Sequence, residues 1–397
     1  MKPIALVSNT TWYVYNFRLN LALEMRKQGL EVLVIAPFDK YTPKLEELGF
    51  TCVDWQLNRR GVNPFEDFIA LFNLYRIYRA YQPAIVHHFT IKCCLYGTLA
   101  CFWDGTMHAV NSVTGLGHAV LSDSPKFKLI RPILLRLWAN TLGMKCSNPI
   151  FQNEVDLGLL SAYAPRLRSN SFVSARSGVN LDYFQPVPLT DRNPFQLRVV
   201  FAGRLIEEKG IREFVAAAKA VRQEHPSVTF VACGEIDYGN RSAINADDLA
   251  EWEQEGHVEF PGHVSDIRQT LREADMFVLP SYREGLSRVL LEASAMGLPI
   301  VAANVPGCRE VVTSERTGLL VPPRDSEALA SAITQLVESP EKRTEFGQNA
   351  REKAELLFDE RFVINDILEL YRQLTPKLLN DANEQAQQIP TRDQVEI

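Results

Sequence analysis

Residues 197–210 read Leu-Arg-Val-Val-Phe-Ala-Gly-Arg-Leu-Ile-Glu-Glu-Lys-Gly. The apolar run Leu197–Ala202 has the length of a buried strand, and Gly210 leads into an amphipathic helical pattern that ends near Glu224. Together these form one strand–turn–helix unit. A chain that repeats this unit is expected to build a parallel sheet covered by helices on both faces.

The unit recurs in two series along the chain. Strands are predicted at 4–8, 31–36, 51–55, 84–87, 108–112 and 149–151, and again at 197–202, 228–233, 258–260, 276–279, 299–302 and 318–321. Helical patterns between them include 15–28, 65–81, 210–224, 287–296 and 326–338. The proline-rich stretch 185–194 separates the two series and predicts an interdomain linker. The predicted fold is α/β, with two doubly wound, Rossmann-like domains facing a central cleft, at 1–185 and 195–358.

Length and composition exclude several other classes of protein. The chain has 397 residues, more than one hydrophobic core supports, and 46% hydrophobic with 23% charged residues is typical of soluble globular domains. We find no long apolar run and no signal-peptide pattern, and the seven cysteines lack paired CxxC spacing. We therefore expect a cytoplasmic chain with reduced thiols, and a polar, disordered tail at 380–397.

Charge is divided unevenly between the two halves. Residues 1–190 hold 19 basic and 13 acidic residues, a balance of +6, although the whole chain has a net charge of −6. Such asymmetry predicts that the first half meets an anionic surface. Two domains with unrelated surface charge remain the alternative.

The segment Ser281-Tyr-Arg-Glu-Gly-Leu-Ser-Arg-Val-Leu-Leu-Glu292 follows a predicted strand and opens a helix. Gly285 permits a tight turn, and the free backbone N–H groups of 286–288 form an anion site. Carboxylates repel bare phosphate, so Glu284 and Glu292 indicate hydroxyl groups, such as those of a ribose and a hexose. An ordinary helix N-terminus with an exposed glutamate is the alternative.

Arg204 and Lys209 follow the first strand of the second series. The guanidinium presents a planar fork to phosphate oxygens, and the ammonium adds a point charge five residues later. Two solvated cations near Glu207 and Glu208 are the alternative. No GxGxxG fingerprint is present here, which disfavours a nicotinamide or flavin cofactor.

The pattern Gly-Arg-x4-Lys-Gly followed by Glu-Gly-x6-Glu resembles the retaining glycosyltransferases of family four, which have the GT-B fold and use nucleotide-sugar donors. The resemblance extends over nearly all of 1–375 and includes the segments 275–281, 292–299 and 318–322. It implies a C-terminal helix at about 360–378 that packs back on the first domain. It also implies that the first domain binds the acceptor and the second the nucleotide sugar.

The resemblance assigns roles to residues of the second domain. Arg204 and Lys209 would bind the donor diphosphate, Glu292 the ribose and Glu284 the donor sugar, and Glu284, Arg204 and Lys209 would be catalytic. The implied donor set is Gly203, Arg204, Lys209, Gly234, Glu235, His263, Val264, Glu284, Gly285, Leu286, Ser287 and Glu292. We expect no cofactor and no metal ion.

The first domain resembles a bacterial subgroup that acts on polyprenyl-diphosphate-linked sugars, including enzymes that transfer N-acetylgalactosamine. The segments that carry this similarity are 9–18, 87–92 and 111–117, and the implied acceptor residues are Asn16, Arg18, Lys92, Thr114, Gly115 and His118. The chain departs from many relatives at 8–12, where it has no glycine-rich loop, and at Thr114, where they have histidine. The part of any histidine in catalysis therefore stays open.

Residues 124–145 form an apolar helical pattern with five basic residues and Trp138. A basic amphipathic stretch suits an anionic membrane surface and a lipid diphosphate, whereas an ordinary packed helix with basic rims is the alternative. We predict a glycosyltransferase on the inner face of the plasma membrane, which moves a hexose or N-acetylhexosamine from a UDP-sugar to a lipid-linked saccharide. We expect no nucleic-acid partner. A UDP-sugar 2-epimerase and a non-catalytic sugar-nucleotide-binding protein remain the alternatives.

Overall fold

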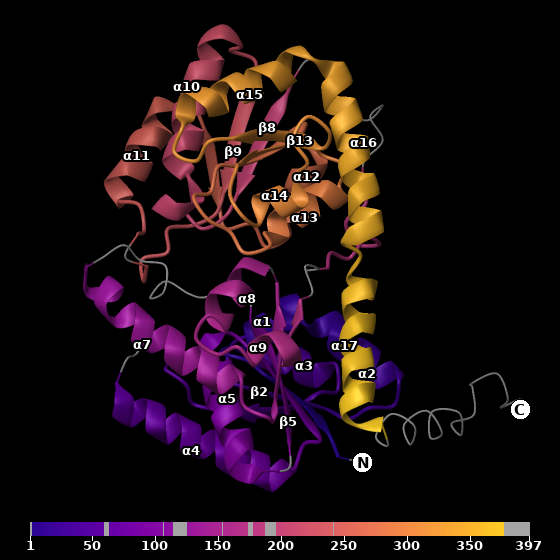
Figure 1. Ribbon diagram of the computed structural model, residues 1–397. Coiled ribbons are helices and arrows are strands. Elements are labelled where there is room, and N and C mark those ends of the chain that lie inside the picture. Colours follow the sequence, from indigo (N-terminus) through magenta and orange to yellow (C-terminus); the bar gives the residue numbers. More distant parts are fainter. Residues whose placement is uncertain are drawn as a thin grey trace, which may run out of the picture. The chain divides into compact units, whose positions relative to one another are not determined.

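The structure is a computed structural model that describes residues 2–58, 63–105, 107–113, 125–152, 154–173, 178–186, 196–240 and 242–376, with only the backbone at 125–128. The chain forms two compact units (Figure 1). The first contains Met1–Ala175 and Ile364–Ile397, and the second Arg176–Val363. The tail expected at 380–397 lies outside the described residues.

A seven-stranded parallel sheet forms the centre of the first unit, in the order β3-β2-β1-β4-β5-β6-β7. Its strands are β1 (Ile4–Val7), β2 (Val32–Ala36), β3 (Thr51–Asp54), β4 (Ile85–Phe89), β5 (His108–Val113), β6 (Ser147–Phe151) and β7 (Phe172–Val173). Six of them lie where the apolar runs predict them. With two residues, β7 is too short to produce a recognisable pattern.

Helices of the first unit alternate with these strands. They are α1 (Thr11–Phe17), α2 (Leu19–Lys27), α3 (Thr42–Glu47), α4 (Pro64–Tyr81), α5 (Ile91–Asp104), α7 (Pro125–Leu142), α8 (Glu154–Ser161), α9 (Leu167–Asn170) and α17 (Glu360–Leu374). The single helix expected at 15–28 is two helices, because the backbone at Arg18 leaves helical geometry with φ −132° and ψ 3°. The Arg18 guanidinium lies 4.7 Å from the ring centre of Phe89.

Side-chain alternation along β4 assigns helices to the two faces of this sheet. The imidazole of His88 lies 2.7 Å from the Tyr78 hydroxyl of α4, whereas the imidazole of its neighbour His87 lies 2.6 Å from the Tyr371 hydroxyl of α17. Helices α4 and α5 therefore cover one face and α17 the other. The C-terminal helix is anchored in the first unit by a buried hydrogen bond.

A six-stranded parallel sheet in the order β10-β9-β8-β11-β12-β13 forms the second unit. Its strands are β8 (Arg198–Ala202), β9 (Thr229–Cys233), β10 (Glu259–Gly262), β11 (Met276–Leu279), β12 (Ile300–Ala303) and β13 (Gly318–Val321). The helices are η2 (Glu207–Lys209), α10 (Ile211–Glu224), α11 (Ala246–Glu255), α12 (Ile267–Arg272), α13 (Arg288–Ala295), α14 (Cys308–Val311), α15 (Ser326–Glu338) and α16 (Pro340–Leu357). Both sheets follow the doubly wound order 3-2-1-4-5-6, so the predicted fold class is confirmed.

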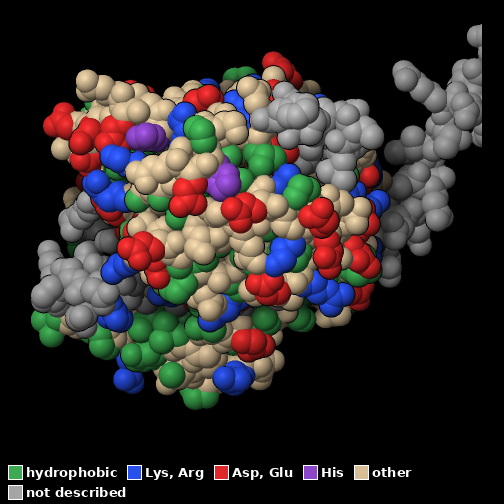
Figure 2. Space-filling view, turned by 90° about the horizontal axis from the view of Figure 1, so that it is seen from above, with side chains coloured by type: hydrophobic (Ala, Val, Ile, Leu, Met, Phe, Trp, Pro, Cys, Tyr) green, Lys and Arg blue, Asp and Glu red, His purple; other side chains and the backbone are tan. Residues whose placement is uncertain are grey.

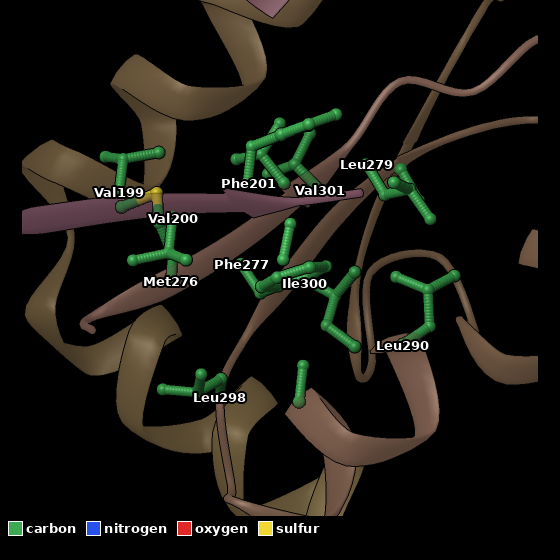
Figure 3. Packing of buried hydrophobic residues seen from close by; sticks show 14 of the residues in the cluster. Val199, Val200, Phe201, Met276, Phe277, Leu279, Leu290, Leu298, Ile300 and Val301 are labelled. Atoms are coloured by element: carbon green, nitrogen blue, oxygen red, sulfur yellow. The ribbon is translucent and has the colours of Figure 1, made fainter. Parts of the chain in front are cut away.

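The core of the second unit is built on the central strands. Figure 3 shows Val199, Phe277 and Ile300 of β8, β11 and β12 together with Leu290 of α13, and all four side chains are 0% exposed. Burial of one such side chain stabilises the fold by about 1.5–3 kcal/mol. Leu290 thus fixes α13 against the sheet, and with it the helix start that follows β11.

The second unit begins ahead of the proline-rich stretch at 185–194. The Val179 N–H donates to the Phe358 carbonyl (2.8 Å), and the Glu360 N–H donates to the Val179 carbonyl (3.1 Å). These bonds tie the chain before the predicted linker to the end of α16. The boundary between the two units therefore follows from the backbone hydrogen bonds of Val179 with Phe358 and Glu360, and not from the position of the prolines.

Candidate donor and acceptor sites

The loops after β8 and β11 flank the point where the strand order of the second sheet reverses. β8 is hydrogen-bonded to β11, and the chain leaves them toward opposite edges of the sheet. In doubly wound folds the crevice at this point, outside the carboxyl ends of the strands, binds the ligand. Gly203 and Arg204 follow β8, and residues 281–287 follow β11.

Lys209, Ser281 and Glu284 form a hydrogen-bonded cluster at this point. Lys209 Nζ lies 2.5 Å from Glu284 Oε1, and Ser281 Oγ donates to the same oxygen at 2.6 Å. The Lys209 and Glu284 side chains are only 19% and 10% exposed. Because the charges are mostly withdrawn from water, the pair is screened little by salt and holds both groups in one place.

Glycine at position 210 is required for this cluster. Gly210 has φ 71°, and a Cβ there would lie 2.2 Å from the Pro280 carbonyl oxygen. The chain after η2 can therefore pass directly against the end of β11. That approach brings Lys209 to Glu284, 75 positions later in the sequence.

Arg204 has a carboxylate partner that the sequence did not indicate. Its Nη1 lies 2.8 Å from Asp237 Oδ2. The Arg204 side chain is 60% exposed, so the pair is open to solvent and weak. Both cations predicted to bind the donor diphosphate, Arg204 and Lys209, thus face a carboxylate of the protein.

Helix α13 begins beside this cluster, with Ser287 as its N-cap residue. Leu286 and Ser287 are buried, and the first-turn N–H groups lack intrahelical acceptors, as at every helix start. Glu292 lies inside the helix and is buried, and Arg288 Nε donates to its Oε1 at 2.8 Å. Burial raises the pKa of the Glu292 carboxyl, and the Arg288 charge opposes that shift. The i, i+4 spacing of this pair was visible in the sequence, but was not recognised.

The segments expected to form the base pocket converge at the ends of β9 and β10. The Gly234 N–H donates to the Gly262 carbonyl (2.9 Å), and a Cβ at Gly234 would lie 1.8 Å from the Gly203 carbonyl oxygen. The Glu235 carbonyl accepts from the Leu205 N–H. His263 is exposed and Val264 packs partly on the core. The structure thus brings the loops after β8, β9 and β10 together.

Three of the six predicted acceptor residues, Asn16, Arg18 and Lys92, lie in the described part of the first unit, after β1 and β4. The side-chain amide of Asn16 donates to the Trp12 carbonyl (2.9 Å), and Arg18 stacks on Phe89. Lys92 Nζ lies 2.9 Å from Asp67 Oδ1. Thr114, Gly115 and His118 lie outside the described residues.

His87 and His88 are core residues. His88 Nδ1 lies 2.8 Å from Asn111 Oδ1, and the Asn111 amide donates to Thr98 and Ser147. The Asn111 oxygen therefore accepts from His88 Nδ1–H, which leaves Nε2 to accept from Tyr78. Burial lowers the pKa of His88 to about 4. Burial also holds the pKa of His87 well below its ordinary value, aided by the charge of Arg18.

Membrane-spanning helices and clusters of metal ligands are two features that the described residues lack. Within the described ranges, no helix is long and apolar enough to cross a bilayer, and no three His, Cys, Asp or Glu side chains are grouped to hold a metal ion. All seven cysteines are free thiols. The side chains of Lys126 and Lys128 lie outside the described part of the chain. Figure 2 shows one face of the molecule, on which basic and acidic side chains are interspersed.

Two protein families match the chain, one within each half. "Glycosyl transferases group 1" matches residues 191–353, and "Glycosyl transferase 4-like" matches residues 3–142. Arg204, Lys209, Glu284 and Glu292, which we predict to bind the donor, all lie within the first of these matches.

Similar proteins cover most of the chain. The N,N'-diacetylbacillosaminyl-diphospho-undecaprenol alpha-1,3-N-acetylgalactosaminyltransferase of Campylobacter jejuni is 28% identical over 383 residues, 93% of this chain and 98% of that protein. The UDP-Gal:alpha-D-GlcNAc-diphosphoundecaprenol alpha-1,3-galactosyltransferase of Escherichia coli is 24% identical over 70% of this chain and 73% of its own. Among solved structures, Anabaena HepE in complex with UDP superposes with a TM-score of 0.75 at 19% identity, covering 94% of this chain and 100% of that one.

Proposed function

The chain belongs to the group 1 glycosyltransferases of GT-B fold, and from this premise we propose that it transfers a hexose or N-acetylhexosamine from a UDP-sugar to a saccharide carried on a polyprenyl diphosphate. The product would serve cell-surface glycan assembly. The lipid-linked substrates printed in the names of the Campylobacter jejuni and Escherichia coli relatives support this choice of acceptor.

The observation that carries the proposal is the cluster of Lys209, Ser281 and Glu284 at the switch point of the second sheet, beside Arg204. Two cations and the start of α13 supply positive potential for a diphosphate. Glu284 supplies an acceptor for hydroxyl groups of the donor sugar, and Ser281 and Lys209 hold its carboxylate in position.

The proposed reaction needs no nucleophilic side chain. The bond between the anomeric carbon and the diphosphate oxygen breaks, and a bond from the acceptor oxygen to that carbon forms on the same face, with retention. The acceptor proton passes to the departing diphosphate oxygen. Arg204, Lys209 and the first-turn amides of α13 stabilise the charge that grows on UDP, which is electrostatic catalysis by preorganised groups.

We propose that transfer requires no metal ion, since Arg204 and Lys209 supply the positive charge that a bound Mg²⁺ provides in other phosphate sites. Activity should be unchanged when a chelator is added to protein purified without divalent cations. Loss of activity in the chelator, with recovery on adding Mg²⁺, would overturn this part of the proposal.

We further propose that the first unit binds the acceptor while the protein is attached to the inner face of the plasma membrane. The excess of basic residues over 1–190 supports attraction to anionic lipid headgroups, at about 1 kcal/mol for each cation near the surface. Sedimentation with anionic but not with neutral liposomes, decreasing as salt is raised, is the expected result. Equal binding to both kinds of liposome would count against it.

Release of UDP provides the direct test of function. UDP should be released from a UDP-sugar only when a polyprenyl-diphosphate-linked saccharide is added. An epimerase would convert the UDP-sugar to an isomer without any acceptor, and a binding protein would do neither. UDP should also raise the melting temperature more than GDP or ADP at equal concentration, because a ligand of the native state stabilises it by mass action.

A further inference from the structure

Helices α5 and α7 enclose an apolar pocket at the carboxyl end of β5. Its empty space is about 290 Å³, partly open to solvent, and it is lined by Ile91, Cys94, Leu95, Val113, Trp138 and Leu142. A short hydrocarbon segment suits this lining, whereas a sugar or a phosphate would lose its hydrogen bonds to water there.

We infer that this pocket holds the isoprene units of the acceptor's lipid carrier that lie nearest the diphosphate. The inference rests on the proposed function and adds a binding site for the lipid to it. The pocket lies at the carboxyl end of the first sheet, because Val113 ends β5 and Ile91 begins α5 just after β4. This is the edge at which doubly wound sheets bind their ligands, so saccharide and lipid would be bound at the same edge.

The outer face of α7 supports a hydrocarbon ligand. Leu129, Ile133 and Leu137 recur every four residues and are 80%, 70% and 49% exposed, whereas Leu135 and Ala139 on the opposite face are buried. A helix that is apolar on two faces is expected to be covered on both. One face packs on α5, and the other is available to the lipid phase from which the carrier would enter the pocket.

A second helix repeats this feature. Phe65, Phe68, Ile69 and Phe72 of α4 share one helical face and are exposed, while Leu74 on the opposite face is buried. Helix α4 also packs against α5, so α5 lies between two helices with apolar exposed faces. Large exposed apolar groups of this kind mark interaction sites.

The basic residues of α7 also suit a lipid diphosphate. Residues 125–142 contain four basic residues, Lys126, Lys128, Arg131 and Arg136, and no acidic residue. The ligand that combines a hydrocarbon chain with an anionic head is the lipid diphosphate itself. A second copy of this chain would need an acidic apolar face to complement α7.

The test compares two variants of α5. Leu95→Phe adds bulk to a lining residue, and Leu99→Phe makes the same change one turn later on the same helix, at a residue outside the lining. Both leucines are half-buried against the same core cluster, so their effects on folding should match. Melting temperatures of the two variants check this.

Acceptors with the same diphospho-saccharide and with no, one, two or three isoprene units are the probes. For the unaltered protein and Leu99→Phe, kcat/KM should rise about tenfold or more as the first units are added. Leu95→Phe should lose this rise and keep its UDP affinity and its rate on the acceptor without isoprene. An undiminished rise in Leu95→Phe would overturn the pocket assignment, as would a rise that Leu99→Phe loses equally.

Two further results would overturn the inference in other ways. If Leu95→Phe weakened sedimentation with vesicles lacking any acceptor, the pocket would bind bulk lipid. If the protein dimerised through α7, with Leu129→Ser and Ile133→Ser restoring the monomer, the exposed face would be a protein interface. If the transfer rate does not depend on the number of isoprene units, only this inference is refuted. If no lipid-linked saccharide accepts a sugar, the proposed function itself is refuted.

Discussion

Replacing Asp237 by Asn should tighten the binding of UDP, although it removes a charged residue from the donor site. Asp237 Oδ2 lies 2.8 Å from Arg204 Nη1, which belongs to the guanidinium proposed to bind the diphosphate. The diphosphate must therefore replace this carboxylate or accept a negative charge beside it. Either effect opposes binding, and Asp237→Asn removes both.

The magnitude follows from exposure of the pair. With the Arg204 side chain 60% exposed, the ion pair contributes about 0.2–1 kcal/mol, the range of surface pairs. Since about 1.4 kcal/mol corresponds to a tenfold change, the Kd for UDP should fall by up to about fivefold. High salt should reduce the gain, because an exposed pair is screened.

Isothermal titration calorimetry with UDP at low and high salt measures this. The matched control is Asp248→Asn, which removes a carboxylate of the same unit that pairs with Arg212, outside the proposed site. The control should leave the Kd unchanged. If Asp237→Asn weakened the binding of UDP instead, Asp237 would orient Arg204 toward the phosphates. The proposal that Asp237 competes with the diphosphate for Arg204 would then be refuted.

Three further predictions concern single residues. Glu292→Gln should weaken the binding of UDP, because Glu292 is proposed to hold the ribose, whereas Glu284→Gln should lower turnover and leave UDP affinity nearly intact. Equal loss of UDP affinity in both variants, measured by calorimetry, would refute these separate roles. Because the pKa of His88 is about 4 in the folded protein and about 6.5 in unfolded chains, the unfolded state binds more protons between these values. Lowering the pH from 6.5 to 5 should therefore reduce the free energy of unfolding by about 1.6 kcal/mol through His88, and His87 should add to this loss. A flat pH profile in urea titrations would contradict this. Gly97→Ala, which favours isolated helices, should instead destabilise by about 1–3 kcal/mol, since its Cβ would lie 2.0 Å from His88 Nε2; an unchanged melting temperature would disprove the clash.

Local patterns in the sequence determined the fold class and most elements of the sheets. An apolar run such as Val199–Ala202 is buried in a doubly wound sheet, and its short length, its β-branched and aromatic residues and the Gly203 that follows indicate a strand without knowledge of its neighbours. Arg204, Lys209 and Glu284 were visible in the sequence as charged residues that follow strand ends, and the family resemblance implies their proposed donor roles. The break at Arg18 was not accessible, since helical periodicity continues through it.

Tertiary structure alone decided which polar groups meet. Lys209 and Glu284 are 75 positions apart, and His87 and Tyr371 are 284 apart. Lys209 meets Glu284 because the segments after neighbouring strands of a parallel sheet end at one edge, and sheet order is a property of the folded chain. His87 meets Tyr371 because α17 packs on a face of the first sheet. The sequence likewise could not show that one apolar face of α4 and of α7 is exposed. A helix that is apolar on two faces predicts that both are buried, and only the packing of the folded protein shows which face it covers.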